Sequence, residues 1–295
     1  MTDLIDNLLA LAPNEGFNCT SLPGVGVFKA SETSGRVPLC YNQGVILMAQ
    51  GQKRVYLGDQ TYHYNPDNYL VLTLPLPAEC ETIVTQGEPL LSMVLDFDSA
   101  MLGELVRLYD EHHMAPKTAD SDGNKGLFVS EYGDELKCVV ERLSTCLRTP
   151  LHAAALGKGL VREILFHLLQ GPQAASLFAL ASHNTHLARL ERAIKYLNEH
   201  YQQKLDVEQL AQLANMSPSS FHRNFRQMTS TSPIQYIKKI RLTRARQLLT
   251  DQGIKVKQAA IQVGYDSPTQ FSREFKRYFG LSPQDCGRSA AQISA

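Results

Sequence analysis

Two segments near the end of the chain repeat one pattern of residue types, and both carry side chains that donate hydrogen bonds. At an offset of 50 residues, Ser-Pro pairs, phenylalanines and arginines coincide: Ser217-Pro218 with Ser267-Pro268, Phe221 with Phe271, Arg223 with Arg273, Phe225 with Phe275, and Ser232-Pro233 with Ser282-Pro283. On a helix, at 100° per residue, the phenylalanines share one face and the donors the opposite face. The donor faces comprise Ser219, His222, Arg223 and Arg226 in the first copy and Thr269, Gln270, Ser272, Arg273, Lys276 and Arg277 in the second. Such side chains can contact guanine edges and phosphates, so the predicted chemistry is binding to double-stranded DNA.

Each copy is predicted to be a helix-turn-helix, with the donor-rich segment as its second helix. A small residue in the first helix, Ala211 or Ala260, allows the two helices to cross closely. A serine, Ser217 or Ser267, can cap the second helix, and the proline after it takes the first helical position, where its missing N–H costs nothing. The predicted motifs cover residues 206–228 and 255–278.

A long helix is predicted to connect the two motifs. It begins at Ser232-Pro233, ends near Gly253, and mixes apolar residues with the basic residues Lys238, Lys239, Arg241, Arg244 and Arg246. Such a helix would hold the two donor faces at a fixed separation. Held about 34 Å apart, they would enter successive major grooves on one face of a duplex.

These features resemble the AraC/XylS family of bacterial transcription regulators. The resemblance covers residues 186–285 and rests on Leu210-Ala211, Met216-Ser217, Phe225, Ser232-Pro233, Val263-Gly264-Tyr265, Phe271-Ser272-Arg273-Glu274-Phe275-Lys276 and Gly280-Leu281-Ser282-Pro283. It implies a double helix-turn-helix, binding to promoter DNA, contact with RNA polymerase, and activation of transcription in response to an effector. The first copy departs from the family at Thr231, since a glycine often precedes Ser-Pro there.

The first half is similar to the cupin-like domain of such regulators, through Tyr69-Leu70-Val71, Leu74-Pro75 and Gln50-Gly51-Gln52-Lys53. Short segments rich in β-branched, leucine and tyrosine residues, separated by turn residues, independently predict strands at Val45–Ala49, Arg54–Leu57, Thr61–Tyr64, Tyr69–Leu74 and Leu90–Phe97. Strands this short predict an antiparallel sandwich or small barrel. From Ser99 onward the apolar spacing becomes helical.

The predicted fold class is therefore α+β: a cupin-like β-sandwich or barrel with helices over residues 1–170, a linker over 171–185, and an all-helical DNA-binding domain over 186–290. Charge follows the same division. Residues 1–185 hold 12 Lys/Arg and 21 Asp/Glu, a net charge of −9, whereas residues 186–295 hold 17 and 8, a net charge of +9. This asymmetry indicates that the second part binds a polyanion.

The first domain is predicted to sense a small molecule and to form a homodimer. An effector pocket is expected inside the sheet, with Tyr41, Tyr62 or Tyr64 as its polar groups and with Val45, Leu47, Val55, Leu57, Leu72, Met93 and Leu95 as its walls. Two alternatives are a closed core without a ligand and a thiol sensor at Cys40 or Cys80. The stripe Leu136–Leu147 is a candidate dimer surface, although it can also pack on its own sheet.

Other classes of protein have less support. His63 stands alone between two tyrosines, and the six cysteines are scattered, so we expect no metal and no cofactor. No phosphate loop or catalytic triad pattern is present, which argues against an enzyme. No apolar run suits a membrane span, and Asp3 and Asp6 precede the first apolar run, so a cytoplasmic protein is expected. The rival interpretation is a small-molecule-binding or enzymatic cupin with a non-specific nucleic-acid tether, which would not need Arg223 and Arg273 in register.

Overall fold

The computed structural model describes residues 2–114, 126–182 and 185–293. The chain forms two compact units, mainly residues 1–188 and 189–295. The first contains β-sheets with helices and the second is helical, which confirms the predicted α+β class. Within the described ranges no single helix is long and apolar enough to span a membrane; one pair of consecutive helices passes that test together but is bent by 116°.

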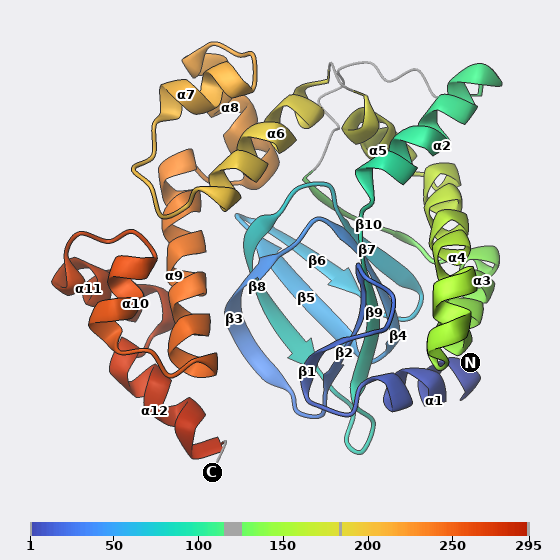
Figure 1. The fold of residues 1–295 in the computed structure, drawn as a ribbon, viewed down its shortest axis with the longest axis horizontal. Coiled ribbons are helices and arrows are strands. Elements are labelled where there is room, and N and C mark those ends of the chain that lie inside the picture. Colours follow the sequence, from blue (N-terminus) through green and yellow to red (C-terminus); the bar gives the residue numbers. More distant parts are fainter. Residues whose placement is uncertain (1, 115–125, 183–184, 294–295) are drawn as a thin grey trace. The chain divides into compact units, whose positions relative to one another are not determined.

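The N-terminal unit is built on two sheets (Figure 1). A six-stranded antiparallel sheet has the order β1-β2-β9-β4-β7-β10, and a four-stranded sheet has the order β3-β8-β5-β6. The strands are β1 (Gly16–Cys19), β2 (Val25–Ala30), β3 (Ser34–Tyr41), β4 (Gly44–Gln50), β5 (Gln52–Leu57), β6 (Gln60–Tyr64), β7 (Asn68–Leu72), β8 (Leu76–Ile83), β9 (Leu90–Asp96) and β10 (Leu127–Glu131). All five strands predicted from the sequence are present.

Among the described residues of this unit, five helices accompany the sheets and bury one face of the six-stranded sheet. They are α1 (Thr2–Leu11), α2 (Ser99–Glu111), α3 (Asp134–Leu147), α4 (Pro150–Gln170) and α5 (Ala174–Ala181). The stripe on α3 lies in the shared core, so the Leu136–Leu147 face packs within its own unit. Helix α5 occupies part of the predicted linker, because Leu177 and Phe178 are almost fully buried in the same core.

The two faces of the large sheet correct the predicted pocket walls. Val45, Leu47, Met93 and Leu95 belong to the core that the sheet shares with the helices. Side chains alternate between faces along a strand, so the intervening residues of β4 and β9 point the other way. The predicted wall therefore mixed both faces of the six-stranded sheet, with Leu72 opposite the helix-covered face, and added Val55 and Leu57 from the four-stranded sheet.

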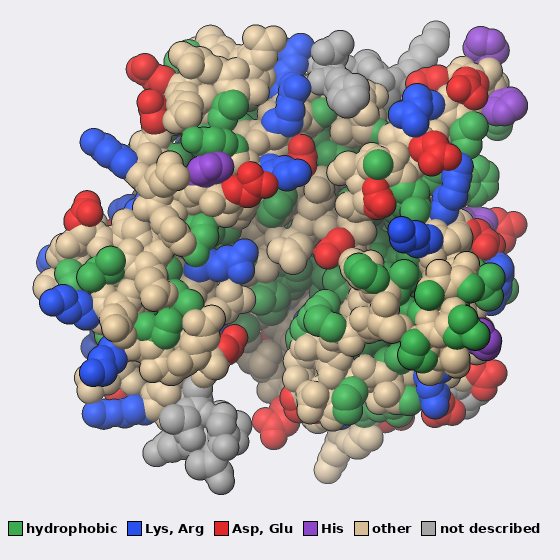
Figure 2. All heavy atoms as spheres, viewed as in Figure 1, with side chains coloured by type: hydrophobic (Ala, Val, Ile, Leu, Met, Phe, Trp, Pro, Cys, Tyr) green, Lys and Arg blue, Asp and Glu red, His purple; other side chains and the backbone are tan. Residues whose placement is uncertain are grey.

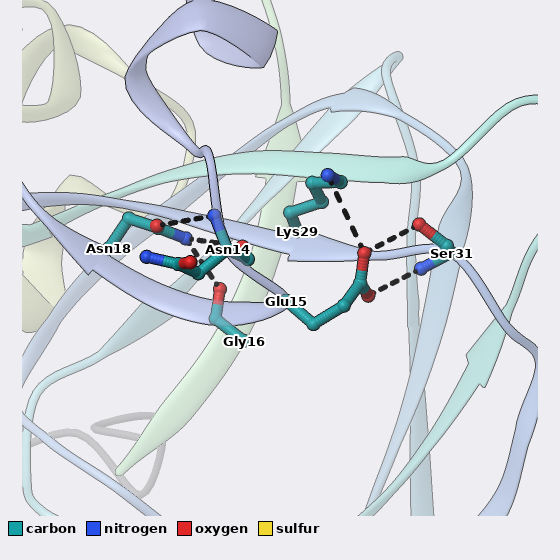
Figure 3. A network of polar contacts seen from close by, with 6 residues as sticks. All are labelled: Asn14, Glu15, Gly16, Asn18, Lys29 and Ser31. Carbon is teal, nitrogen blue, oxygen red and sulfur yellow. Dashed lines mark hydrogen bonds and ion pairs between the residues drawn. The ribbon is translucent and has the colours of Figure 1, made fainter. Parts of the chain in front are cut away.

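The first hairpin is fastened by a polar network at the sheet edge (Figure 3). Glu15 accepts hydrogen bonds from the Ser31 hydroxyl at 2.6 Å and the Ser31 amide at 2.8 Å, and Lys29 lies 3.6 Å away. The hydrogen bond from the Ser31 side chain is the main reason that the pKa of Glu15 lies below its ordinary value. The Asn18 amide donates to the carbonyls of Asn14 and Gly16, which fixes the turn into β1.

The C-terminal unit consists of seven helices in the part of the chain that the structure describes. They are α6 (His186–Glu199), α7 (Val207–Leu213), α8 (Pro218–Thr229), α9 (Pro233–Asp251), α10 (Val256–Gln262), α11 (Pro268–Phe279) and α12 (Pro283–Ile293). Helices α7 and α8 form the first predicted motif and α10 and α11 the second. The connecting helix α9 has 19 residues, which at 1.5 Å per residue is about 28 Å long.

The two motifs repeat in their turns as well as in their helices. Asn215 and Gly264 both take positive φ, 50° and 85°, between the two helices of their motif. The next residue then donates its amide to the first helix, from Met216 to Ala211 and from Tyr265 to Ala260. The second turn is one residue longer, with Gly264-Tyr265-Asp266 before Ser267 against Asn215-Met216 before Ser217, and it keeps this hydrogen bond.

The ends of α8 and α11 also correspond. They show that the departure from the family's glycine lies at Ser230, not at Thr231 as the sequence had suggested. Gly280 ends α11 with φ 77°, and Ser230 occupies the equivalent left-handed position after α8 with φ 54°. The residue that replaces the family's glycine is thus Ser230. A left-handed serine costs on the order of 1 kcal/mol more than glycine, yet α8 still ends there.

Candidate nucleic-acid interface

Both second helices begin at the predicted caps. The Ser217 hydroxyl accepts a hydrogen bond from the Ser220 amide at 3.3 Å, and the Ser267 hydroxyl accepts one from the Gln270 amide at the same distance. Pro218 and Pro268 take the first helical positions. The cap predictions are therefore confirmed, and they fix the rotation at which each donor face begins.

Equivalent pairs of phenylalanines anchor α8 and α11 in the core. Phe221 and Phe225 are fully buried with ring centroids 5.5 Å apart, and Phe271 and Phe275 repeat this separation. Because these rings fill the inward stripe, the opposite side of each helix is left to solvent. The structure confirms the phenylalanines as core residues.

The predicted donor residues lie on that outer side. Nine of the ten are exposed, namely Ser219, His222, Arg223, Arg226, Thr269, Gln270, Arg273, Lys276 and Arg277, and Ser272 is half-buried. Among the described residues, Arg223, Arg226 and Arg273 have no ion-pair partner. In Figure 2, Lys and Arg side chains project at several places from the surface of α10 to α12.

Three of the ten are already engaged within the helices. The Ser272 hydroxyl donates to the Pro268 carbonyl at 2.9 Å, and the side-chain amide of Gln270 donates to the Glu274 carboxylate at 3.2 Å. The Ser219 hydroxyl lies 3.3 Å from that of Ser217. The arginines are therefore the side chains most available to a ligand.

Glu274 ties the second donor helix to α9. One of its oxygens lies 3.0 Å from the Lys238 ammonium, and the other accepts a hydrogen bond from the Tyr265 hydroxyl at 2.8 Å. Burial raises the pKa of Glu274, but the donors Lys238, Gln270 and Tyr265 outweigh it and hold the pKa below its ordinary value. This contact is therefore complete above the ordinary carboxyl pKa and weakens as pH falls through the lowered value. Asn224 occupies the equivalent place in α8, so only the second motif has this charged tie.

Arg241 on α9 holds the backbone of two separate loops, a role that the sequence did not reveal. Its guanidinium donates to the carbonyls of Tyr201, Gln203 and Gly264 at 2.7, 2.6 and 2.9 Å. The signal was its spacing, since Arg241 lies four residues after Ile237 and four before Ala245, both buried. A cation on a buried stripe needs partners, and here backbone carbonyls supply them.

Gly264 makes this close approach possible. A Cβ at this position would collide with the carbonyl of Gln202, and its φ of 85° disfavours other residues. Glycine is thus required in the second turn for two independent reasons. The first turn tolerates Asn215, a residue that commonly adopts the left-handed region.

A second candidate site lies between the two sheets of the N-terminal unit. Lys53 and Val55 pair across β5 and β6 with Tyr64 and Tyr62, so these four side chains share one face. Lys53 is only 5% exposed, and its ammonium lies 3.7 Å from the centroid of the Phe28 ring. Burial lowers its pKa, with a smaller opposing effect from Cys80.

The other predicted effector residues are placed as follows. Tyr64 is buried, Tyr62 is half-buried with its pKa raised by burial, and Tyr41 ends β3. Of the two candidate sensor thiols, Cys80 is buried and Cys40 is partly exposed. No group of three or more His, Cys, Asp or Glu that could hold a metal ion occurs in the described ranges.

Comparison with known proteins decides the family. A family model described as the AraC-type transcriptional regulator N-terminus matches residues 21–176, more than half of the chain. The chain belongs to the AraC-type transcriptional regulators. A helix-turn-helix domain model matches residues 210–289, which cover the second motif of this AraC-type regulator and the first motif from Leu210 onward.

Curated relatives resemble part of this AraC-type regulator. It is 34% identical over 145 residues to the HTH-type transcriptional activator RhaS of Klebsiella pneumoniae (strain 342), covering 48% of this chain and 50% of RhaS. RhaS of Citrobacter koseri is 34% identical over 132 residues, covering 44% and 47%. The chain thus spans about half the length of the curated relatives it matches.

Solved structures share the fold over nearly the whole chain. An apo form of a ToxT variant from Vibrio cholerae aligns with a TM-score of 0.59 at 11% identity, covering 93% of this chain and 97% of ToxT. Wild-type ToxT bound to an unsaturated fatty acid aligns with a TM-score of 0.57 at 12% identity, covering 89% and 94%. At such identities the likeness shows the fold alone.

Proposed function

We propose that this AraC-type regulator activates transcription by binding a specific promoter sequence through both donor faces. The observation that carries the proposal is the pair of equivalent exposed arginines, Arg223 and Arg273, on helices with equivalent caps and equivalent core packing. The net charge of +9 over residues 186–295 supports binding to a polyanion. The names of the RhaS activators support activation.

The donor side chains are assigned to two kinds of contact, with base edges and with phosphates. Arginine can pair bidentately with guanine, so Arg223 and Arg273 are assigned to base edges. Arg226, Lys276 and Arg277 lie nearer the ends of their helices and are assigned to phosphates. The remaining donors would contribute base or phosphate contacts, His222 and Thr269 directly and Ser219, Gln270 and Ser272 after exchanging their present partners.

Selection of duplexes from a random pool by the full chain tests this function. We expect a motif with two separate blocks, one for each donor face, and an affinity that falls steeply with salt because bound phosphates release counterions. Binding without a motif would instead support the rival interpretation, a cupin with a non-specific tether and a different activity.

We further propose a homodimer in the cytoplasm that contacts RNA polymerase. Leu151 and Leu156 are 73% and 58% exposed on α4 and are apolar side chains that a second copy would cover, whereas the α3 stripe is already buried. Sedimentation at micromolar concentration measures the association, and a strictly monomeric protein with and without DNA would contradict it.

The effector that this proposal implies is an organic acid bound between the two sheets. Lys53 has no carboxylate partner among the described residues, and an isolated buried ammonium is unfavourable unless a ligand supplies the opposite charge. The Phe28 ring and the neighbouring Tyr62 and Tyr64 would contact the body of the acid. The fatty acid bound to ToxT supports this class of ligand.

Lys53→Met is expected to abolish the response to an acid while preserving the fold, because methionine fills a similar volume without a buried charge. The measurement is promoter affinity with and without an unsaturated fatty acid, and with its uncharged methyl ester. We expect the acid to shift the affinity of the unmodified protein and the ester to leave it unchanged.

Lys29→Met is the matched control, since Lys29 lies next to Phe28 on β2 but pairs with Glu15 outside the site. It should respond like the unmodified protein. An undiminished response in Lys53→Met would exclude Lys53 as the acid-binding group.

A further inference from the structure

A cleft with a volume of about 380 Å³ lies where α4 ends, beside the edge strand β10. Its walls come from three places in the N-terminal unit: the end of β10, the first turn of α3, and the turn from α4 toward α5. It lies on the helix-covered side of the large sheet, where Tyr69 belongs to the shared core, and it is separate from the Lys53 face.

Three carboxylates line this cleft. Glu131, Asp134 and Glu135 are all exposed there. Asp134 and Glu135 also stabilise the N-terminus of α3, but a helix end carries only about half a positive charge. The basic group nearest to them in the cleft is His167, whose Nδ1 lies 3.6 Å from Glu135 and is charged only when protonated. The cleft therefore has an excess of negative charge.

A largely buried tyrosine, Tyr69, also lines the cleft. The Ser130 hydroxyl is buried, with the residue 5% exposed, and it has no hydrogen-bond partner among the described residues. A Cβ on Gly171 would lie 3.0 Å from the Tyr69 hydroxyl and 3.9 Å from that of Ser130. Tyr69 and Gly171 both line the cleft, so the missing side chain at Gly171 leaves the Tyr69 hydroxyl uncovered on that side, whereas the buried Ser130 hydroxyl does not line the cleft.

We propose that this cleft binds a small organic cation, a protonated amine or a guanidinium compound, through the carboxylates of Glu131, Asp134 and Glu135 and the hydroxyl of Tyr69. The volume suits a small organic molecule better than a bare ion. Burial raises the pKa of Tyr69 by more than the nearby Ser130 lowers it, so the Tyr69 hydroxyl stays protonated. Guanidinium and ammonium groups both match carboxylates with charge-assisted hydrogen bonds.

The position of the cleft gives such a ligand a route to regulation. Gln170, Gly171 and Pro172 form the turn between α4 and α5, and α5 leads along the chain to the DNA-binding unit. A ligand that contacts this turn would favour one placement of α5. This consequence rests on the proposed function, whereas binding of the cation does not.

Calorimetric titration of the full chain with putrescine and with agmatine tests the site, and 1,4-butanediol serves as the uncharged probe. We expect saturable binding of at least one cation and none of the diol. The double variant Glu131→Gln/Asp134→Asn and the variant Gly171→Ala should each weaken binding by about tenfold or more. Alanine suits the backbone conformation at 171, where φ is −70°, and its methyl group would crowd the Tyr69 hydroxyl and the Leu168 carbonyl.

Two control variants separate the cleft from general charge and general helix effects. Glu111→Gln removes an exposed carboxylate of α2, and Gly159→Ala adds a methyl group on α4 where nothing lies within 4 Å. Both should bind the cation normally. Absence of saturable binding by either cation, or equal binding in all variants, would overturn the site, and motif selection on DNA would be unaffected by that result.

Discussion

Replacing Arg273 by alanine is expected to weaken binding to the selected duplex by about 5- to 150-fold, while binding to unrelated DNA changes little. Arg273 is exposed on α11 and has no ion-pair partner among the described residues, so its loss removes a base contact without disturbing the fold. Titrations on the selected duplex and on a shuffled duplex measure the two affinities.

Lys276→Ala on the same helix is the control for this prediction. Because Lys276 is assigned to phosphate, its loss should weaken both duplexes alike and reduce the salt dependence. If Arg273→Ala also weakened both duplexes equally, Arg273 would be a phosphate contact and the assignment to base edges would be wrong.

Arg241→Met should destabilise the C-terminal unit by about 1.5–3 kcal/mol, the value of a charged hydrogen bond. The variant leaves the carbonyls of Tyr201, Gln203 and Gly264 without their donor, so the loop after α6 and the turn of the second motif both loosen. Urea unfolding followed by helical circular dichroism measures the change. DNA affinity should fall with it, because the turn at Gly264 positions α11.

Arg244→Met provides the comparison on the same helix. Arg244 is exposed and donates a hydrogen bond to Gln247, one turn along α9, so its loss should change stability by less than about 0.5 kcal/mol. Equal stability of the two variants would mean that the three carbonyl contacts of Arg241 contribute nothing.

The DNA-binding unit was largely predictable because its signals are local and occur twice. Serine caps, Pro at the first helical position and the Phe221 and Phe225 spacing each specify a helix and its inward face within a few residues. The tie between Glu274 and Lys238 was not predictable, since it joins residues 36 positions apart. A helical pattern in the sequence predicts which face of a helix is buried, but it does not predict which other helix packs against that face.

In the N-terminal unit, the sequence predicted the strands but not how their faces are paired. Alternation correctly paired Val45 with Leu47 and Val55 with Leu57, but we assigned all four to one inward face, because alternation does not tell which face of each sheet meets the helices. Lys53 had a usable signal, because it occupies the same alternating face as Val55. Helix α5 was missed because its small residues suggest a linker, although Leu177 and Phe178 are core residues.

The spacing of the selected motif tests the central claim most directly, namely that two donor faces held by α9 bind one duplex together. We predict two blocks about 10–10.5 base pairs apart, centre to centre. Inserting five base pairs between them should reduce affinity to that of a single block, because the second block then faces the opposite side of the duplex. Unchanged affinity after this insertion would contradict the account, since it would show that only one motif binds specifically.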